Sequence, residues 1–286
     1  NRVPFKCGFK LEEIIKRLIV SIEDILKEIQ TKNLNGIYKL DKKAFDELKN
    51  VQFILKDMIL RGNSQNIYWV DFVDVQGKYL RLTYAPKNVS KLSANLLTRT
   101  HAGVILTSAT LSTSEDDYRY YSSSVGLDKI VGKQVLKEFP QTSPYDYDNH
   151  TILYCPQDIA SPKNRNQYLE DIVTQGKTLV LFTSKSDMNY VYEHIGTYNF
   201  DFPIYIQKEN IDTKTLKDSF EKNISSCLFA TGSFYEGIDI KGESLSQVII
   251  AKLPFPIVDP VIDYKASQYQ DGFLQVYLPE MIYKLK

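Results

Sequence analysis

Side chains suited to chemistry are concentrated between residues 231 and 239, directly after an apolar run. They are the hydroxyls of Thr231 and Ser233 and the carboxylates of Glu236 and Asp239. Gly237 stands between the two carboxylates, where a glycine lets the backbone approach a ligand closely. A carboxylate at the end of a strand can accept hydrogen bonds from ribose hydroxyls. A surface turn explains the neighbouring Gly242-Glu243 but not this cluster, so the segment indicates a nucleotide site.

Hydroxyl side chains follow two other apolar runs, where they have a simpler explanation. Ser108 and Thr110 come after the run VILT, and hydroxyls at a strand end could relay a hydrogen-bond change from a nucleotide pocket to a neighbouring domain. Thr183 and Ser184 follow the run TLVLF, and N–H groups at the start of the next helix could hold a phosphate. Taken alone, each pattern favours an ordinary turn or helix cap, because Ser and Thr are common there.

Gly176-Lys177-Thr178 matches the end of a phosphate-binding P-loop but fails two of its requirements. The motif needs a glycine five positions before Gly176, where the sequence has Asp171. A P-loop also follows a strand and opens a helix, so that backbone amides face the phosphate. Here the expected strand 178–182 begins at the motif instead. We therefore reject a P-loop and expect Gly176 to end a helix.

After Pro86, short apolar runs alternate with amphipathic segments, and these predict the elements that hold the side chains above. Strands are expected at 104–107, 152–154, 178–182, 204–206, 227–230 and 247–251. Helices are expected at 166–175, 185–196, 213–222 and after Asp259. Strands that are apolar throughout, with helices between them, are typical of a parallel sheet covered on both faces. The sequence thus predicts an α/β fold whose ligands bind where the strands end.

A helical hairpin is predicted near the start of the chain. Apolar side chains there recur at spacings of four and three, which places them on one helical stripe. They are Leu11, Ile15, Leu18, Ile22, Ile25 and Ile29. The segment Asn33 to Gly36 interrupts the pattern, and Asp41 can cap a second helix with apolar positions from Phe45 to Met58. Such a stripe is a packing surface far more often than a ligand site.

A β-hairpin is predicted between this pair and the α/β region. The runs IYWVDFVDV and KYLRLTY flank Gln76-Gly77, and apolar runs around a two-residue turn with glycine are typical of a hairpin. Trp69 and the tyrosines could stack on bases. Strands need such residues for packing, so packing is the favoured interpretation.

Composition and charge exclude several classes of protein. Lys and Arg together number 35, as do Asp and Glu, so the net charge is +0 and a surface that is basic throughout is excluded. The three cysteines are too few for a four-cysteine metal site and odd in number for a disulfide framework, so we expect a cytoplasmic protein. Apolar runs are far shorter than the ~20 residues of a membrane helix, so no membrane contact is expected. The opening NRVPFKCGFK has neither Met nor an apolar signal segment, so a fragment is expected.

Four segments form a specific combination in their order along the chain. They are SATL from Ser108, FTS from Phe182, TGSFYEGIDIKGESLSQVII from Thr231 and KLPFP from Lys252. In this order they resemble the motifs of the DinG branch of the XPD-like DNA helicases. Further matching pieces are Gln207, Asp259-Pro260 and the closing YLPEMIYKLK from Tyr277. The resemblance covers the chain from about residue 80 to its end.

The resemblance implies two RecA-like motor domains, with ATP held between them and single-stranded DNA across their top. It implies an α/β fold in which a RecA-like parallel sheet flanked by helices follows a helical hairpin and a β-hairpin. Residues 1–65 would be the helical hairpin, a remnant of an arch-like insertion. Residues 66–112 would hold the β-hairpin and the last strand region of the first RecA-like domain, and 113–286 the second.

The same resemblance implies roles for individual residues. Ser108 and Thr110 would couple the ATP state to the grip on DNA. Glu236, Gly237 and Asp239 would face the ribose and γ-phosphate of the nucleotide. The residues expected to contact DNA are Thr183, Ser184, Gln207, Thr231 and Ser233.

The chain departs from the family pattern in ways that bear on activity. It has no P-loop, no DEAH-type acid motif and no cysteine cluster, and it stops before the glutamine and arginine motif. Of these groups, the phosphate cradle of the P-loop, the magnesium-binding acids and the arginines stabilise the transferring phosphate. ATP and Mg²⁺ are therefore expected as cofactors of a longer parent enzyme, and this chain alone should not hydrolyse ATP. We expect no metal ion or iron–sulfur cluster in the chain, which should be a monomer.

Two other functions stay open. One is a non-catalytic module for single-stranded nucleic acid, which predicts salt-sensitive binding that ATP does not alter. The other is the ATP-sensing region of a helicase-like exonuclease, although the sequence supplies no nuclease cluster of metal-binding acids. A Rossmann dehydrogenase is remote, because no G-x-G-x-x-G follows any expected strand.

Overall fold

The computed structural model describes residues 2–5, 8–34, 41–60, 64–72, 80–99, 103–108, 110–114, 117–130, 146–158, 160, 164, 167, 177–196, 199–235, 240 and 242–286. The chain forms two compact units. Unit 1 contains Asn1–Leu136 and Pro256–Pro279, and unit 2 contains Lys137–Phe255 and Glu280–Lys286. Each unit is therefore assembled from two separate stretches of the chain.

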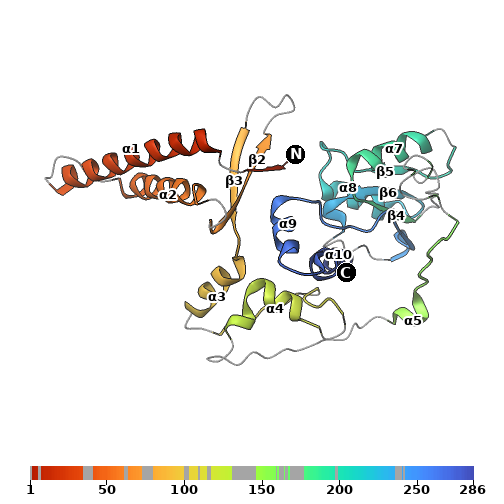
Figure 1. Cartoon of the computed structure of the whole chain (residues 1–286). Helices are drawn as coiled ribbons and strands as arrows, with labels where there is room; N and C mark the ends of the chain where they lie inside the picture. The colour runs from red at the N-terminus through yellow and green to blue at the C-terminus, as the bar shows by residue number, and fades with distance from the viewer. Residues whose placement is uncertain are drawn as a thin grey trace. The chain divides into compact units, whose positions relative to one another are not determined.

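Unit 2 is built on a parallel sheet of four strands in the order β5-β6-β4-β7 (Figure 1). The strands are β4 (Thr178–Phe182), β5 (Ile204–Ile206), β6 (Cys227–Thr231) and β7 (Gln247–Ile250). Every residue of the central strands β4 and β6 is buried. The α/β fold and these four strands are confirmed, and burial on both faces explains the nearly continuous apolar runs of β4 and β6.

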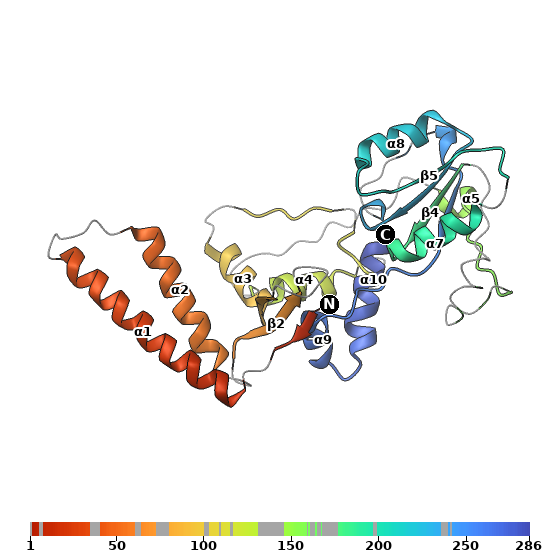
Figure 2. The ribbon, with the colours of Figure 1, turned by 90° about the horizontal axis from the view of Figure 1, so that it is seen from above.

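Two helices cover opposite faces of this sheet, as Figure 2 shows. Val180 and Phe182 of β4 belong to the same core as residues of α7 (Lys185–Ile195). Leu179 and Leu181 belong to a second core with residues of α8 (Thr213–Lys222). Successive side chains of a strand point to opposite faces, so β4 alternates between the two cores. Each large apolar side chain buried in this way contributes about 1.5–3 kcal/mol.

Shorter elements complete the second half of the chain. They are α5 (Tyr147–His150), the 3-10 turns Gly232–Phe234 and Gly242–Ser244, the π-helical turn Phe273–Tyr277 and α10 (Leu278–Leu285). The helix expected at 166–175 lies outside the described residues except for Gln167.

The predicted helical hairpin is confirmed in unit 1. The helices α1 (Phe9–Leu34) and α2 (Lys42–Met58) lie side by side in both views (Figures 1 and 2). Asp41 caps α2, because its carboxylate accepts hydrogen bonds from the N–H groups of Lys43 and Ala44 at 3.0 and 3.2 Å.

The stripe predicted for α1 is only partly correct. The buried residues are Ile15, Ile19, Ile22 and Leu26. Three members of the predicted stripe are instead exposed, namely Leu11, Leu18 and Ile25. At 3.6 residues per turn the buried stripe is rotated by roughly 50° from the predicted one. Apolar residues cover a wider arc of α1 than α2 can bury, so spacing alone did not fix which edge of that arc faces the partner.

The predicted β-hairpin is also confirmed. It consists of β2 (Asn66–Phe72) and β3 (Leu80–Pro86), and β1 (Arg2–Pro4) adds to β2 on the other side in an antiparallel sheet. The turn at Gln76-Gly77 lies outside the described residues. Trp69 is buried and donates from Nε1 to Asp71 at 3.1 Å, which agrees with packing rather than base stacking.

Further helices pack within unit 1. They are α3 (Val89–Arg99), α4 (Arg119–Val125), the 3-10 turn Leu127–Lys129 and α9 (Pro260–Ser267). Gly126 ends α4 at φ +78°, and a Cβ there would lie 2.0 Å from the Ser90 carbonyl oxygen, so only glycine fits. The helix α9 contacts β1 and β2. Its Lys265 donates to the Tyr120 hydroxyl at 2.7 Å, which ties it to α4.

Two predicted strands are wrong. Residues 104–107 and 152–154 form no strand, and their apolar side chains are exposed, Ile105 to 90% and Ile152 to 93%. A strand needs a neighbour to satisfy its backbone groups, and no strand of the described residues pairs with either run. The division into 1–65, 66–112 and 113–286 stays a prediction, because compact units and helicase domains need not coincide.

A buried carboxylate fixes the helical hairpin to the β-sheet of unit 1. Asp57, at the end of α2, is 4% exposed. It accepts hydrogen bonds from Ser64 Oγ at 2.7 Å, Gln65 N at 2.9 Å, Asn66 Nδ2 at 2.7 Å and the Tyr68 hydroxyl at 2.8 Å. Burial alone would raise the pKa of Asp57, but these hydrogen bonds outweigh it and hold the pKa below its ordinary value.

We expect Asp57→Asn to lower the free energy of unfolding at pH 7 by about 2–4 kcal/mol, because four donors, three of them buried, lose their charged acceptor. The folded pKa of Asp57 is lowered, so its contribution is present above the unfolded pKa and is lost as pH falls through the folded pKa. The difference between parent and variant should therefore shrink below about pH 4. Urea unfolding at pH 7 and pH 3 measures it, with the exposed Asp46→Asn on α2 as control. A loss of unfolding free energy on Asp57→Asn that is the same at both pH values would contradict this account.

Candidate functional site

The carboxyl edge of the unit 2 sheet gathers four of the side chains singled out from the sequence. Thr183 and Ser184 follow β4, Gln207 follows β5 and Thr231 is the last residue of β6. The register aligns Phe182 of β4 with Thr231, so the ends of these strands lie side by side. Because the strands are all parallel, this is the edge at which open α/β sheets bind ligands.

Gln207 joins the ends of β5 and β6. Its Oε1 accepts hydrogen bonds from the Thr231 backbone N–H at 2.8 Å and from the Thr231 hydroxyl at 3.1 Å. Thr231 is only 7% exposed. Two of the residues expected from the resemblance to contact DNA therefore contact each other.

Ser184 is the N-cap of α7. Its hydroxyl accepts from the Asp187 N–H at 3.1 Å and lies 3.3 Å from the hydroxyl of Ser186. This confirms the helix-cap interpretation of Ser184. Thr183 is exposed. Of these two neighbours, Thr183 thus presents the more accessible hydroxyl at the strand ends.

An ion pair connects the first residue of α7 with the loop after β5. Lys185 Nζ lies 3.0 Å from Glu209 Oε1, and the hydrogen bond from Lys185 holds the pKa of Glu209 below its ordinary value. Both side chains are exposed, so the pair contributes little to stability. Lys208 follows β5 and Lys252 follows β7, and both are exposed as well. The edge thus carries several cations that could meet phosphate groups.

Tyr235 makes contacts that the sequence analysis missed. Its hydroxyl lies 3.3 Å from the Leu181 carbonyl oxygen and 3.4 Å from that of Lys252, at the ends of β4 and β7. The adjacent Phe234 is buried in the core that contains α8 residues. Together they anchor the turn Gly232–Phe234 after β6. The two carbonyl partners lie 54 and 17 positions away, so no local spacing signals them.

The expected nucleotide residues fall elsewhere. Ser233 lies within the turn Gly232–Phe234. Glu236, Gly237 and Asp239 lie outside the described residues. Their contact with a nucleotide therefore stays a prediction.

Ser108 and Thr110 belong to unit 1. Their hydroxyl oxygens are 3.3 Å apart, and the Thr110 N–H donates to Ser108 Oγ at 3.3 Å. Such local contacts are typical of a serine turn. The coupling role expected of the two residues stays a prediction.

Lys177, in the rejected P-loop match, lies at the amino edge of the sheet. Its N–H donates to the Ser226 carbonyl at 2.8 Å and its carbonyl accepts from Ser246 N–H at 3.0 Å. A P-loop lysine follows a strand, whereas Lys177 directly precedes β4, so the rejection is confirmed. Lys177 has φ +65°, a left-handed conformation that costs a residue with a Cβ about 1–2 kcal/mol.

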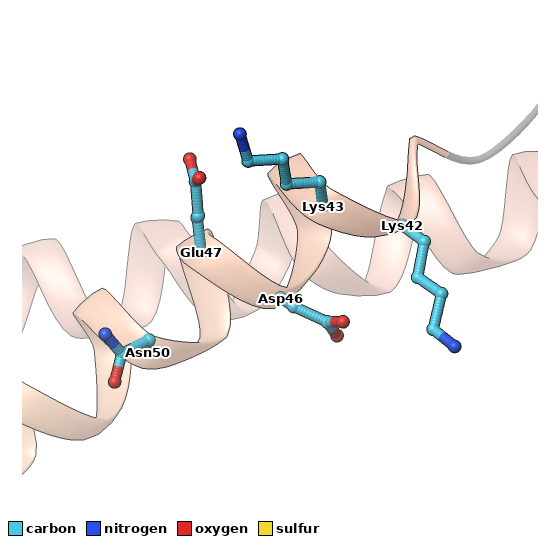
Figure 3. Close-up of a pocket in the computed structure, with 5 residues that line it drawn as sticks. All are labelled: Lys42, Lys43, Asp46, Glu47 and Asn50. Carbon is cyan, nitrogen blue, oxygen red and sulfur yellow. The ribbon is translucent and has the colours of Figure 1, made fainter.

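A shallow hollow on α2 does not qualify as a site. It is lined by Lys42, Lys43, Asp46, Glu47 and Asn50, all exposed. Figure 3 shows Lys43 and Glu47 on one side of the helix and Lys42 and Asp46 on another. Side chains that diverge from one helix enclose no ligand.

The described residues supply no metal site, because no three or more His, Cys, Asp or Glu side chains gather among them. The motif resemblance implies that Mg²⁺ binds together with ATP. The described residues do not fit such an ion, so we derive no step through a metal. In the part of the chain with described structure, no helix has the length and apolar character needed to cross a membrane.

The class of protein follows from comparison with known families. Residues 169–286, which include the sheet of unit 2 and its carboxyl edge, match the model of the family described as helicase C-terminal domain. The sheet of unit 2 and its carboxyl edge therefore lie within a segment similar to a helicase C-terminal domain.

Curated relatives narrow this class. The ATP-dependent DNA helicase DinG of Photobacterium profundum is 31% identical over 232 residues, 74% of this chain and 32% of that protein. The ATP-dependent DNA helicase YoaA of Haemophilus influenzae is 27% identical over 276 residues, 92% of this chain and 41% of that protein. The 3'-5' exonuclease DinG of Bacillus subtilis is 25% identical over 249 residues, 80% of this chain and 26% of that protein.

The chain belongs with the DinG-like branch of the XPD-like helicases and corresponds to a C-terminal portion of them, as the order of its motifs predicts. It spans between about a quarter and two fifths of the length of these relatives.

We expect Lys177→Gly to raise the free energy of unfolding by up to about 1 kcal/mol and Lys177→Val to lower it by at least about 1 kcal/mol, because only glycine adopts φ +65° without strain. Urea unfolding measures both. Neither change should alter nucleotide binding, which would be a property of the opposite edge. Loss of nucleotide binding by Lys177→Gly at full stability would contradict the rejection of the P-loop.

Proposed function

We propose that the chain is part of an ATP-dependent DNA helicase that couples ATP hydrolysis to movement along single-stranded DNA in repair or replication. The observation that carries the proposal is the arrangement of Thr183, Lys185 and the Gln207–Thr231 contact at one edge of the sheet. The match of residues 169–286 to a helicase C-terminal domain supports it.

Each group at the edge has a task in this proposal. The exposed Thr183 hydroxyl donates to a phosphate oxygen, and Lys185 exchanges Glu209 for that phosphate. Contacts of this kind go to the DNA backbone, so they hold a strand without reading its sequence.

The nucleotide part of the proposal rests on the motif resemblance. Glu236, Gly237 and Asp239 face ATP, and Ser108 and Thr110 transmit its state to the DNA grip. Hydrolysis of ATP by the whole enzyme would supply the free energy for movement along DNA. The sequence carries neither a P-loop nor a DEAH-type acid motif, so we expect the 286 residues alone not to turn ATP over. A monomeric state and a cytoplasmic location belong to the same proposal.

We expect Lys185→Met to weaken binding of the chain to a fluorescein-labelled dT20 strand and to reduce the slope of log K against log salt by about 0.7, the value for one phosphate contact on a single strand. Fluorescence anisotropy between 50 and 200 mM NaCl measures both quantities. Lys43→Met, an exposed lysine on α2, is the matched control and should leave both unchanged.

Three results would contradict the proposal. They are equal effects of the two lysine variants, a preference of the chain for duplex over dT20, and Mg²⁺-dependent ATP turnover by the 286 residues alone. The first would remove the carboxyl edge as the DNA surface, the second would remove single-stranded DNA as the ligand, and the third would remove the assignment of hydrolysis to a longer protein.

A second candidate is the helicase-like region of an exonuclease, favoured by relatives that carry the name 3'-5' exonuclease DinG. The described residues gather no acidic metal-binding cluster, so we expect the chain itself to leave a labelled strand uncut in the presence of Mg²⁺ or Mn²⁺. Denaturing electrophoresis of dT20 after incubation measures cleavage. Stepwise shortening from the 3' end by the chain would place the nuclease chemistry within these residues.

A further inference from the structure

We infer that Gln207 acts as a positioning residue, which affects DNA binding through its contact with Thr231. This rests on the proposed function, because it concerns how the same edge holds DNA. It differs from the role that the motif resemblance implies for Gln207, which is direct contact.

The side-chain oxygen of Gln207 is fully used within the protein. A carboxamide oxygen has two lone pairs, and Gln207 Oε1 accepts from both the N–H and the hydroxyl of Thr231, at 2.8 and 3.1 Å. The same oxygen therefore has no lone pair left for a donor on a base or sugar.

The position of Gln207 is fixed by its backbone. Its N–H donates to the Phe229 carbonyl at 2.9 Å, which extends the β5–β6 ladder by one bond. The side chain then reaches two residues along β6 to Thr231. Because both ends of this link are held by the sheet, the contact sets where β6 ends.

The residues after Thr231 form the part that this link positions. Gly232 has φ +51°, which starts the 3-10 turn Gly232–Phe234, and Phe234 is buried. An N–H at the start of such a turn has no partner within the turn, and Gln207 supplies one for Thr231. The turn leads in sequence to Glu236, the first of the residues expected at the nucleotide.

The loop after β5 also contacts the other protein segment that is expected to bind DNA, at the start of α7. Glu209, two residues after Gln207, pairs with Lys185 at the start of α7. The loop therefore contacts both the segment that contains Thr183 and the segment that begins at Thr231. Gln207 lies in the element that joins these two segments.

A double-mutant cycle separates positioning from contact, because residues that act through one another are not additive. We expect Gln207→Met to weaken dT20 binding about fivefold and Thr231→Val, which removes only the hydroxyl, about twofold. The double variant should bind like Gln207→Met, within about 1.5-fold. Thr183→Val removes an exposed hydroxyl, and its fold-change in the dissociation constant should multiply with that of Gln207→Met when the two are combined. The exposed Gln275→Met in unit 1 is the matched control and should have no effect.

Each variant is titrated for both its dissociation constant and the fraction of molecules that bind. A positioning role raises the dissociation constant and leaves the binding fraction unchanged. The inference is overturned if the double variant shows the product of the single effects, if Gln207→Met binds like the parent, or if it lowers only the binding fraction. If the unsubstituted chain binds no dT20, the proposed function itself fails and the inference fails with it, a result distinct from the other three.

Discussion

The parallel register between β4 and β6 is the constraint on which the candidate site depends. It sets Phe182 opposite Thr231, so that the residues after β4 and the turn after β6 begin at the same level of the sheet. Both strands are buried on both faces, and their side chains alternate between a core with α7 and a core with α8. A slip of one residue would exchange the two sets of side chains, so the packing of these cores specifies the register strongly.

Polar contacts at the carboxyl edge link the strand ends that the register brings together. Gln207 ties β5 to β6, Tyr235 lies against the ends of β4 and β7, and Lys185 pairs with Glu209 across the loop after β5. Each of these contacts joins residues that lie close in space because the strands are parallel and end at the same edge of one sheet. Unit 1 uses a different device, a single buried carboxylate at Asp57 that accepts four hydrogen bonds and joins a helix to a strand.

Sequence reasoning succeeded where the physical cause is local. The sequence predicts strands such as β4 and β6 because their residues form short, almost continuous apolar runs. It predicts the caps at Asp41 and Ser184 because a short polar side chain accepts from the N–H two or three residues ahead. The runs at 104–107 and 152–154 have the same apolar signal but no strand beside them, and a strand needs a partner as well as a pattern. The Gln207–Thr231 contact joins residues 24 positions apart, so only the fold places them together.

Hydrogen–deuterium exchange of the chain with and without dT20 tests the central claim most directly, because it locates bound DNA without substituting any residue. Binding at the carboxyl edge should slow exchange at the start of α7 after Thr183, in the loop from Gln207 to Glu209, and in the turn Gly232–Phe234. The amino edge around Lys177 should be unchanged. Protection confined to the amino edge of the sheet or to the helical hairpin would contradict the account.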